Sequence, residues 1–174
     1  MGKLKKTYSI LNYHNFCVII YPAQDFQGGI YIMKISTRGR YALRLMIDIA
    51  QNSTEKPVSI KEAAKRQGIS VKYLEQIISV LNNAGYVQSI RGPQGGYLLS
   101  RKPEEYTAGM VLRLTEGPLS TVACTSEDSS CERIGNCPTS ILWRKLDEAV
   151  NGVVDNITLA DLIKWQSGNE VNYE

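Results

Sequence analysis

The sequence predicts a mainly α-helical protein that carries one small β-hairpin, and three observations lead to this fold class. In several separate segments, apolar residues recur at the spacing of three and four that gives an amphipathic helix one buried face. Between two of these segments lie two short β-prone runs, joined by a glycine-rich turn over residues 92–96. In a segment near the carboxyl end, the spacing between apolar residues alternates between four and three, as in a helix that packs along another helix.

The first three helices are predicted from their caps and apolar stripes. We expect a helix over residues 37–51, with Thr37 as its N-cap. Residues 59–62 have the form of a capping box that opens a short second helix, and Gly68 is placed to end it. Ser70 then caps a third helix, and two helices joined by a short turn that contains Gly are typical of a helix-turn-helix. The predicted buried stripes are Ala42, Leu45, Met46 and Ile49 in the first helix and Leu74, Ile77, Ile78 and Leu81 in the third.

The rest of the chain is predicted to form a wing and further helices. Residues 86–90 and 97–99 have the composition of the two strands of a hairpin. A helix is expected after Glu104, capped near Thr107 and ending near Gly117. A long helix follows over residues 138–157, and Thr158 caps a last short helix. The stripe of the long helix, spaced by four, three and four, consists of Leu142, Leu146, Ala149 and Val153.

The amino-terminal segment differs from the rest. Residues 1–32 have no helical or alternating period, ordered patterning begins at Met33, and residues 1–33 are treated as one segment. We predict that they are a non-native or flexible extension, because Gly28 and Gly29 are compatible with translation of an upstream ribosome-binding sequence. The alternative is an arm that contacts DNA through Lys3, Lys5 and Lys6. The sole histidine, His14, lies in this segment and is not expected to bind a metal.

Charge divides the remainder of the chain into two regions. Residues 34–102 carry 12 Lys or Arg against 4 Asp or Glu, a net charge of +8, whereas residues 103–174 carry 5 against 12, a net charge of −7. A basic surface binds DNA by displacing counterions from the phosphates, and an acidic surface is repelled. We therefore predict a winged helix-turn-helix DNA-binding domain at 34–102 and a region with another task at 103–174.

Composition excludes several functional classes. The chain has 174 residues, 43% of them hydrophobic, which suffices for one globular domain. Its best apolar run, residues 16–21, is far shorter than the roughly 20 residues that cross a bilayer, so no membrane partner is predicted. A secretory signal is not evident, and we expect a cytoplasmic protein whose cysteines are reduced. We expect no enzymatic activity and no catalytic residue.

The third helix and the wing supply the candidate DNA-binding residues. Glu75 is suited to accept a hydrogen bond from cytosine in the major groove, and its alternative role is a helix-surface pair with Lys72. Arg91, on a slim turn, is suited to the negative potential of a narrow A·T-rich minor groove, and its alternative is a solvated charge. The full predicted set is Ser70, Lys72, Tyr73, Glu75, Gln76, Arg91 and Gly92.

Three of the four cysteines, Cys124, Cys131 and Cys137, lie in one polar loop. Thiolates are soft ligands for iron–sulfur clusters, zinc or copper(I). Three thiolates are one short of a full set, so the fourth ligand is left open between a thiolate of another chain, a backbone group, a small molecule and an oxygen donor. The alternatives are a three-cysteine zinc site and reactive thiols without a metal. The oxygen donors within reach along the sequence are Glu127, Asp128, Glu132 and Ser140.

Several segments resemble the IscR-type family of winged-helix repressors. These segments are MKISTRGRYALRLMIDIA, SVKYLEQIISVLNNAGYVQSIRGPQGGYLL, YTAGMVLRLTEGP and the cysteine loop followed by LW. The resemblance implies a homodimer held by the long carboxyl-terminal helix, which makes residues 103–174 a cysteine-loop and dimerisation region. It implies recognition helices in the major grooves and wings in the minor groove of a double-stranded operator. It also implies a [2Fe-2S] or [4Fe-4S] cluster, base reading by Glu75 and Gln76, groove reading by Arg91, and cluster ligation by Cys124, Cys131 and Cys137.

The resemblance leaves the fourth ligand undecided. Members with a cluster use a histidine three residues after the third cysteine or an aspartate in the first helix, where this chain has Ser140 and Arg40. The cysteine-metabolism repressor of the family lacks the cysteine loop. We predict a dimeric regulator, a repressor, that senses cluster or redox status and controls genes of cluster assembly or of sulfur and cysteine metabolism. The alternatives are a cluster-free repressor that responds to a sulfur metabolite or a partner enzyme, and a small iron–sulfur redox protein.

Overall fold

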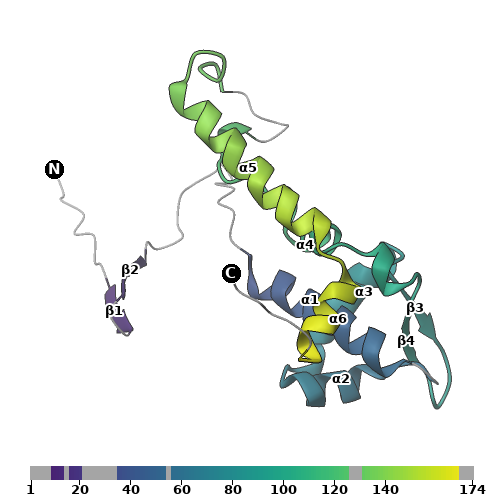
Figure 1. The fold of residues 1–174 in the computed structure, drawn as a ribbon. Coiled ribbons are helices and arrows are strands. Elements are labelled where there is room, and N and C mark those ends of the chain that lie inside the picture. The colour runs from purple at the N-terminus through teal and green to yellow at the C-terminus, as the bar shows by residue number, and fades with distance from the viewer. Residues whose placement is uncertain (1–8, 14–15, 21–34, 54–55, 126–130, 169–174) are drawn as a thin grey trace. The chain divides into compact units, whose positions relative to one another are not determined.

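The structure is a computed structural model, shown as a ribbon in Figure 1. The chain divides into two compact units, Met1–Ile30 and Tyr31–Glu174, and each is described by itself. The described residues are 9–13, 16–20, 35–53, 56–125 and 131–168.

The first unit contains a β-hairpin. Strand β1 (Ser9–Tyr13) pairs antiparallel with β2 (Phe16–Ile20), in a register that sets Tyr13 opposite Phe16. We expected no regular structure in this segment, and the two strands correct that expectation. The sequence pattern missed them because neither five-residue run alternates apolar with polar residues, which is the usual mark of a half-buried strand.

The second unit begins with the three predicted helices. Helix α1 (Thr37–Asn52) has Ser36 as its N-cap rather than Thr37, because the Ser36 hydroxyl accepts the Arg38 amide at 3.0 Å. Helix α2 (Ile60–Gln67) ends at Gly68, whose φ of 65° is the left-handed conformation that the prediction requires. Helix α3 (Val71–Asn83) begins after Ser70, whose hydroxyl accepts the Tyr73 amide at 3.3 Å.

The capping box predicted at the start of α2 is wrong. Ser59 is the N-cap residue, but its side chain makes no capping hydrogen bond. The segment is held by backbone pairing instead, since Val58 and Tyr97 exchange two amide-to-carbonyl hydrogen bonds of 3.0 and 2.9 Å. The start of α2 is therefore where it was predicted, but it is held by pairing with the distant residue Tyr97, which the local sequence does not reveal.

The predicted apolar stripes form the core of this unit. All eight stripe residues of α1 and α3 are at most 2% exposed. Burial of a large aliphatic side chain contributes about 1.5–3 kcal/mol, so these two faces provide much of the driving force for folding. Val87, Tyr106 and Leu159, from later parts of the chain, belong to the same cluster.

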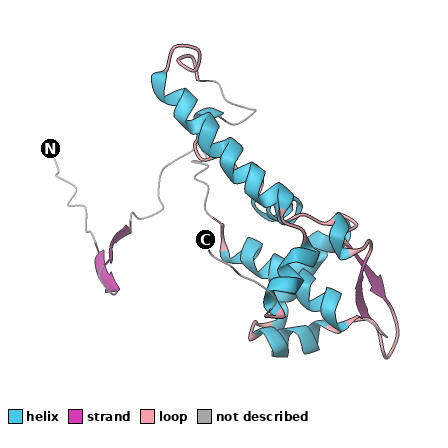
Figure 2. Cartoon of the chain, viewed as in Figure 1, coloured by secondary structure: helices cyan, strands magenta, loops and turns pink. Residues whose placement is uncertain are grey.

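The predicted wing is present as an antiparallel hairpin. Strand β3 (Val87–Ile90) pairs with β4 (Gly96–Leu99), with Val87 opposite Leu99 and Ile90 opposite Gly96. Figure 2 shows this hairpin beside the helices of the second unit. The fold class is therefore confirmed as mainly α-helical with a small β wing.

The remaining elements are η1 (Pro103–Glu105), α4 (Ala108–Glu116), η2 (Ala123–Thr125), α5 (Pro138–Asn156) and α6 (Leu159–Gln166). The Thr107 hydroxyl caps α4 by accepting the Met110 amide at 3.2 Å. Thr158 and Asp161 form a reciprocal capping box at the start of α6. The predicted starts of α4, α5 and α6 are thus confirmed to within a residue.

Two of these later helices pack on the DNA-binding region. Val111 of α4 and Leu159 of α6 belong to the same buried hydrophobic cluster as Leu45 of α1 and Leu74 of α3. Residues after 102 therefore share a hydrophobic core with residues before it, and the predicted boundary at 102 is a boundary of charge. Among the described residues, no helix is both long and apolar enough to cross a membrane.

Candidate DNA-binding surface and cysteine loop

Helix α3 has one buried face and one exposed polar face. Of the predicted DNA-binding residues, Lys72, Glu75 and Gln76 are exposed, as is Ser79, while Leu74 and its stripe face the core. Tyr73 is half-buried, and its ring packs edge-on against Tyr41 with centroids 5.9 Å apart. Tyr73 therefore supports the helix on α1, and Lys72, Glu75 and Gln76 have the freer side chains.

A groove of about 590 Å³ lies between α2, α3 and the wing. Its lining includes Glu75 from α3 and Arg91 from the wing, two residues that are predicted from the sequence on separate grounds. It also includes Ser59 and Lys61, which the sequence prediction missed. The sequence pattern could not indicate Lys61 as a groove residue, because this position becomes part of the groove only when the wing folds beside α2.

Glycines shape the turn of the wing. Gly92 has a φ of 126°, a conformation that residues with a side chain rarely adopt. A Cβ at Gly95 would collide with the Ile90 carbonyl, and a Cβ at Gly96 would collide with the Val58 carbonyl. The turn thus leaves no room for a side chain at Gly95 or Gly96, and Arg91 and Gly92 are both exposed on it.

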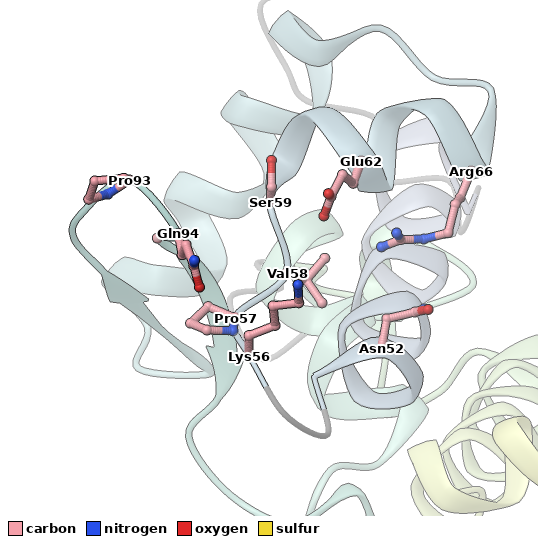
Figure 3. A pocket seen from close by; sticks show the side chains of 10 residues that line it. Asn52, Lys56, Pro57, Val58, Ser59, Glu62, Arg66, Pro93 and Gln94 are labelled. Carbon is pink, nitrogen blue, oxygen red and sulfur yellow. The ribbon is translucent and has the colours of Figure 1, made fainter.

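Behind the wing lies a second, polar pocket of about 310 Å³, shown in Figure 3. Arg66 contributes to its wall and makes two hydrogen bonds of 2.9 and 2.7 Å to Asp48, which is only 3% exposed. Gln67 donates to the same carboxylate at 3.0 Å. Burying an ion pair is favourable only when its hydrogen bonds are satisfied, and here they fix α2 against α1. The orientation of the helix-turn-helix therefore depends on this network.

The cysteine loop connects η2 to α5. Cys124 lies in η2 and Cys137 is the N-cap residue of α5, and both are half-buried, as is Cys131. Glu127 and Asp128, two of the predicted oxygen donors, lie outside the described residues. In the part of the chain that the structure describes, no three Cys, His, Asp or Glu side chains are grouped closely enough to bind one metal ion.

The chemistry of the donor set fits a soft metal centre. Cys137 Sγ lies 3.1 Å from the Thr139 hydroxyl, and this contact is the main reason why the pKa of the Cys137 thiol is below its ordinary value. A lowered pKa favours the thiolate, which is the form that binds metals. Ser140 is 4% exposed and its hydroxyl donates to the Cys137 carbonyl at 2.7 Å.

Helix α5 exposes an apolar stripe to solvent within the single chain. Leu142 is 50% exposed and Val153 is 58% exposed, and Leu146 lies between them on the same face. A large exposed apolar patch on a folded protein marks an interaction site. The stripe is the one that the sequence predicted to pack along another helix.

Comparison with known proteins places the chain among transcriptional regulators. Residues 35–165 match the Rrf2 family, described as iron-dependent transcriptional regulators. Protein rrf2 of Nitratidesulfovibrio vulgaris is 44% identical over 76% of this chain and 88% of its own length. The transcriptional regulator IscR of Serratia proteamaculans is 40% identical over 77% of this chain and 81% of its own length.

Solved structures agree with this grouping. CymR, the global cysteine regulator of Bacillus subtilis, matches with a TM-score of 0.64 and 42% identity over 77% of this chain and 98% of that one. IscR of T. potens matches with a TM-score of 0.63 and 37% identity over 81% of this chain and 93% of that one. These relatives are regulators rather than enzymes, which confirms that no catalytic role is to be expected. From its sequence and its fold, the chain belongs to the Rrf2 family of winged-helix transcriptional regulators.

Proposed function

We propose that this regulator is a homodimeric, cytoplasmic repressor whose three-cysteine loop binds an iron–sulfur cluster and thereby tunes its affinity for an operator. The observation that carries this proposal is the position of the loop. Its last cysteine is the N-cap residue of α5, the helix whose apolar face is exposed. A change in the loop therefore acts directly on the helix that we assign to dimerisation. The genes controlled belong, in this proposal, to cluster assembly or to sulfur and cysteine metabolism.

The DNA-binding role rests on the exposed face of α3 and on the wing. Glu75 and Gln76 read base edges in the major groove, and Arg91 enters the minor groove with Gly92 beside it. Ser70, Lys72 and Tyr73 lie at the amino end of α3, where backbone amides and a positive side chain suit a phosphate. Lys61 adds a further positive charge to the protein groove between α2, α3 and the wing.

The dimer rests on the apolar face of α5. A second copy of the chain is the natural occupant, because a two-fold symmetric pair of these helices buries the same stripe from both sides. A dimer also presents two recognition helices to half-sites that lie roughly 34–36 Å apart on the duplex. The distance between them then depends on how α5 is held.

The cluster rests on Cys124, Cys131 and Cys137. When bound, an iron–sulfur cluster supplies a redox-sensitive centre whose gain or loss changes the charge and constraint of the loop. The fourth ligand is not among these thiols, and because Ser140 is only 4% exposed, an external donor or an acidic residue of the loop is the better candidate.

A second candidate function is a cluster-free repressor that responds to a sulfur metabolite or a partner enzyme. The observation that favours it is the 42% identity to CymR of Bacillus subtilis, which covers 97% of that protein. The small redox protein considered from the sequence is less well supported, since the relatives named above are regulators.

One experiment separates these candidates. The wild-type protein and the Cys124→Ala, Cys131→Ala and Cys137→Ala variants are purified without oxygen, with Cys17→Ser as the control. We expect visible absorbance and stoichiometric iron only in the wild type and in Cys17→Ser. Operator DNA selected from a random library then reports affinity with and without cluster. Stoichiometric iron in any of the three alanine variants contradicts the ligand assignment, and equal operator affinity in both states contradicts the switch.

A further inference from the structure

An aspartate of α5 holds the segment that carries the first cysteine. The Oδ1 atom of Asp147 accepts the Thr121 amide at 2.6 Å, and its Oδ2 atom accepts the Thr125 hydroxyl at 2.5 Å. Thr121 precedes Cys124 by three residues and Thr125 follows it directly. Both carboxylate oxygens are thus bonded to the two sides of the short helical turn that contains Cys124.

The environment of Asp147 keeps the carboxylate charged. Burial alone raises the pKa of Asp147, but the hydrogen bonds from the Thr125 hydroxyl and the Thr121 amide outweigh burial and lower it from its ordinary value. Hydrogen bonds to an ionised acceptor are roughly twice as strong as those between neutral groups. The attachment of the turn to α5 is therefore stronger than two neutral contacts would make it.

The same side of α5 is joined to α4. One turn beyond Asp147, the Asn151 side chain donates to the Asp147 carbonyl at 2.8 Å and accepts from Arg113 of α4 at 2.5 Å. Arg113 also binds Asp155 through two hydrogen bonds of 2.6 and 2.8 Å. Gly109 allows this close approach, because a Cβ there would collide with Asp155 and crowd Arg113.

Helix α4 in turn holds the start of α1. The Glu116 carboxylate accepts the Ser36 hydroxyl at 2.7 Å and the Gly39 amide at 2.8 Å. Gly39 leaves room for this carboxylate, since a Cβ there would lie 2.5 Å from Glu116 Oε1 and 3.1 Å from Leu112. Because α1 shares its core with α3, a continuous series of contacts leads from the turn at Cys124 to the recognition helix.

We propose that Asp147 is a positioning residue that fixes Cys124 on α5, and that Asp147, Asn151 and Arg113 form the connection through which the state of the cysteine loop reaches the DNA-binding domain. The first part, the positioning of Cys124 by Asp147, is supported by the hydrogen bonds alone. The second part rests on the proposed function, because it needs a loop whose state changes.

The first part is tested on reduced, metal-free protein by the rate at which iodoacetamide alkylates each cysteine, measured by mass spectrometry. Asp147→Asn and Thr125→Val remove the charge or one hydrogen bond with little change of volume, and Glu148→Gln, the exposed neighbour on α5, is the matched control. We expect Cys124 to react several-fold faster in Asp147→Asn and measurably faster in Thr125→Val. Cys137 is the internal reference and keeps its wild-type rate. An unchanged Cys124 rate in Asp147→Asn, in protein with a wild-type circular dichroism spectrum, overturns the positioning role.

The second part is tested by anaerobic cluster reconstitution with iron and sulfide, followed by operator titration. We expect Asp147→Asn to bind iron through its three intact cysteines and to lose most of the difference in operator affinity between the two states, while Glu148→Gln keeps it. A full wild-type difference in Asp147→Asn overturns the connection. Wild-type protein that binds no iron contradicts the proposed function and with it the connection, whereas the alkylation rates decide the positioning role of Asp147 without any metal.

Discussion

Helices α3 and α5 carry the same kind of apolar stripe in sequence and have opposite surroundings in the folded chain. The stripe of α3 is buried, with Leu74 and Ile77 fully inaccessible. The stripe of α5 is open to solvent, with Leu142 half exposed and Val153 more than half exposed. An amphipathic face stabilises a protein only when it is covered. The stripe of α3 is covered within the chain, whereas no part of the described chain covers that of α5, which we propose to be the dimer interface.

The largest effect is expected when charged residues are introduced into the apolar stripe of α5. We expect the double variant Leu142→Asp/Leu146→Asp to be monomeric by ultracentrifugation, because four carboxylates would have to be buried in the dimer. Loss of the second half-site contact should lower operator affinity by roughly 10²-fold or more. The far-ultraviolet circular dichroism should remain that of a folded helical protein.

A matched control separates the stripe from charge alone. Arg144→Asp changes the net charge by the same two units, and helical geometry places Arg144 on the opposite side of α5 from Leu142 and Leu146. We expect this variant to remain a dimer. If the double variant is also a dimer, the α5 stripe is not the dimer interface.

The second prediction concerns the covered stripe of α3. Ile77→Ala should lower the free energy of unfolding by about 2–5 kcal/mol, because it removes buried methyl and methylene groups and leaves a cavity. Urea unfolding measures this loss, and Ser79→Ala on the exposed face should stay within about 0.5 kcal/mol of wild type. The same loss should occur in the Leu142→Asp/Leu146→Asp background. A loss seen only in the dimer would mean that the α3 stripe is not an internal core.

The contrast also shows what the sequence can predict. Caps such as Ser70, Thr107 and Thr158 were predictable because a side chain bonds to backbone only two or three residues away. The apolar stripes were predictable because helical geometry alone sets which residues share a face. Whether a stripe is covered depends on distant parts of the fold. The sequence pattern of α5 therefore indicated a packing face, but it did not show that this face stays exposed in the described part of the chain.

Contacts between distant parts of the chain were not predictable. Glu116 caps the start of α1 across 77 residues, and Asp147 binds Thr121 across 26. No periodicity or motif records such pairs. For the same reason Lys61 was missed in the DNA groove, although Glu75 and Arg91, which line it too, were predicted from the chemistry of their own elements.

The third prediction concerns the exposed face of α3 and the wing. Arg91→Ala should weaken binding by about 1–3 kcal/mol at operators with an A·T-rich segment under the wing, and less at other sites. Glu75→Ala should relax the choice of base with little loss of total affinity. Competition titrations on sets of single-base operator variants measure both effects. Lys65→Ala, which removes an exposed charge on α2 away from the groove lining, should weaken all sites alike. Equal losses at every sequence for all three variants would show that Arg91 and Glu75 do not read DNA.

The smallest expected effect comes from removing the ion pair between Arg113 on α4 and Asp155 on α5. Both side chains are more than a third exposed, so solvent screens the pair and Asp155→Asn should cost less than about 1 kcal/mol near neutral pH. The hydrogen bond from Arg113 lowers the pKa of Asp155 below its ordinary value of 3.8. A carboxyl group with a lowered pKa in the folded state stabilises the fold above its unfolded-state pKa and loses this effect as the pH falls through its folded-state pKa. The difference in unfolding free energy between wild type and Asp155→Asn should therefore be constant at pH values well above 3.8 and should shrink as the pH is lowered below 3.8, as measured by urea unfolding across that range. A difference that persists in acid would mean that Asp155 acts through packing rather than through its charge.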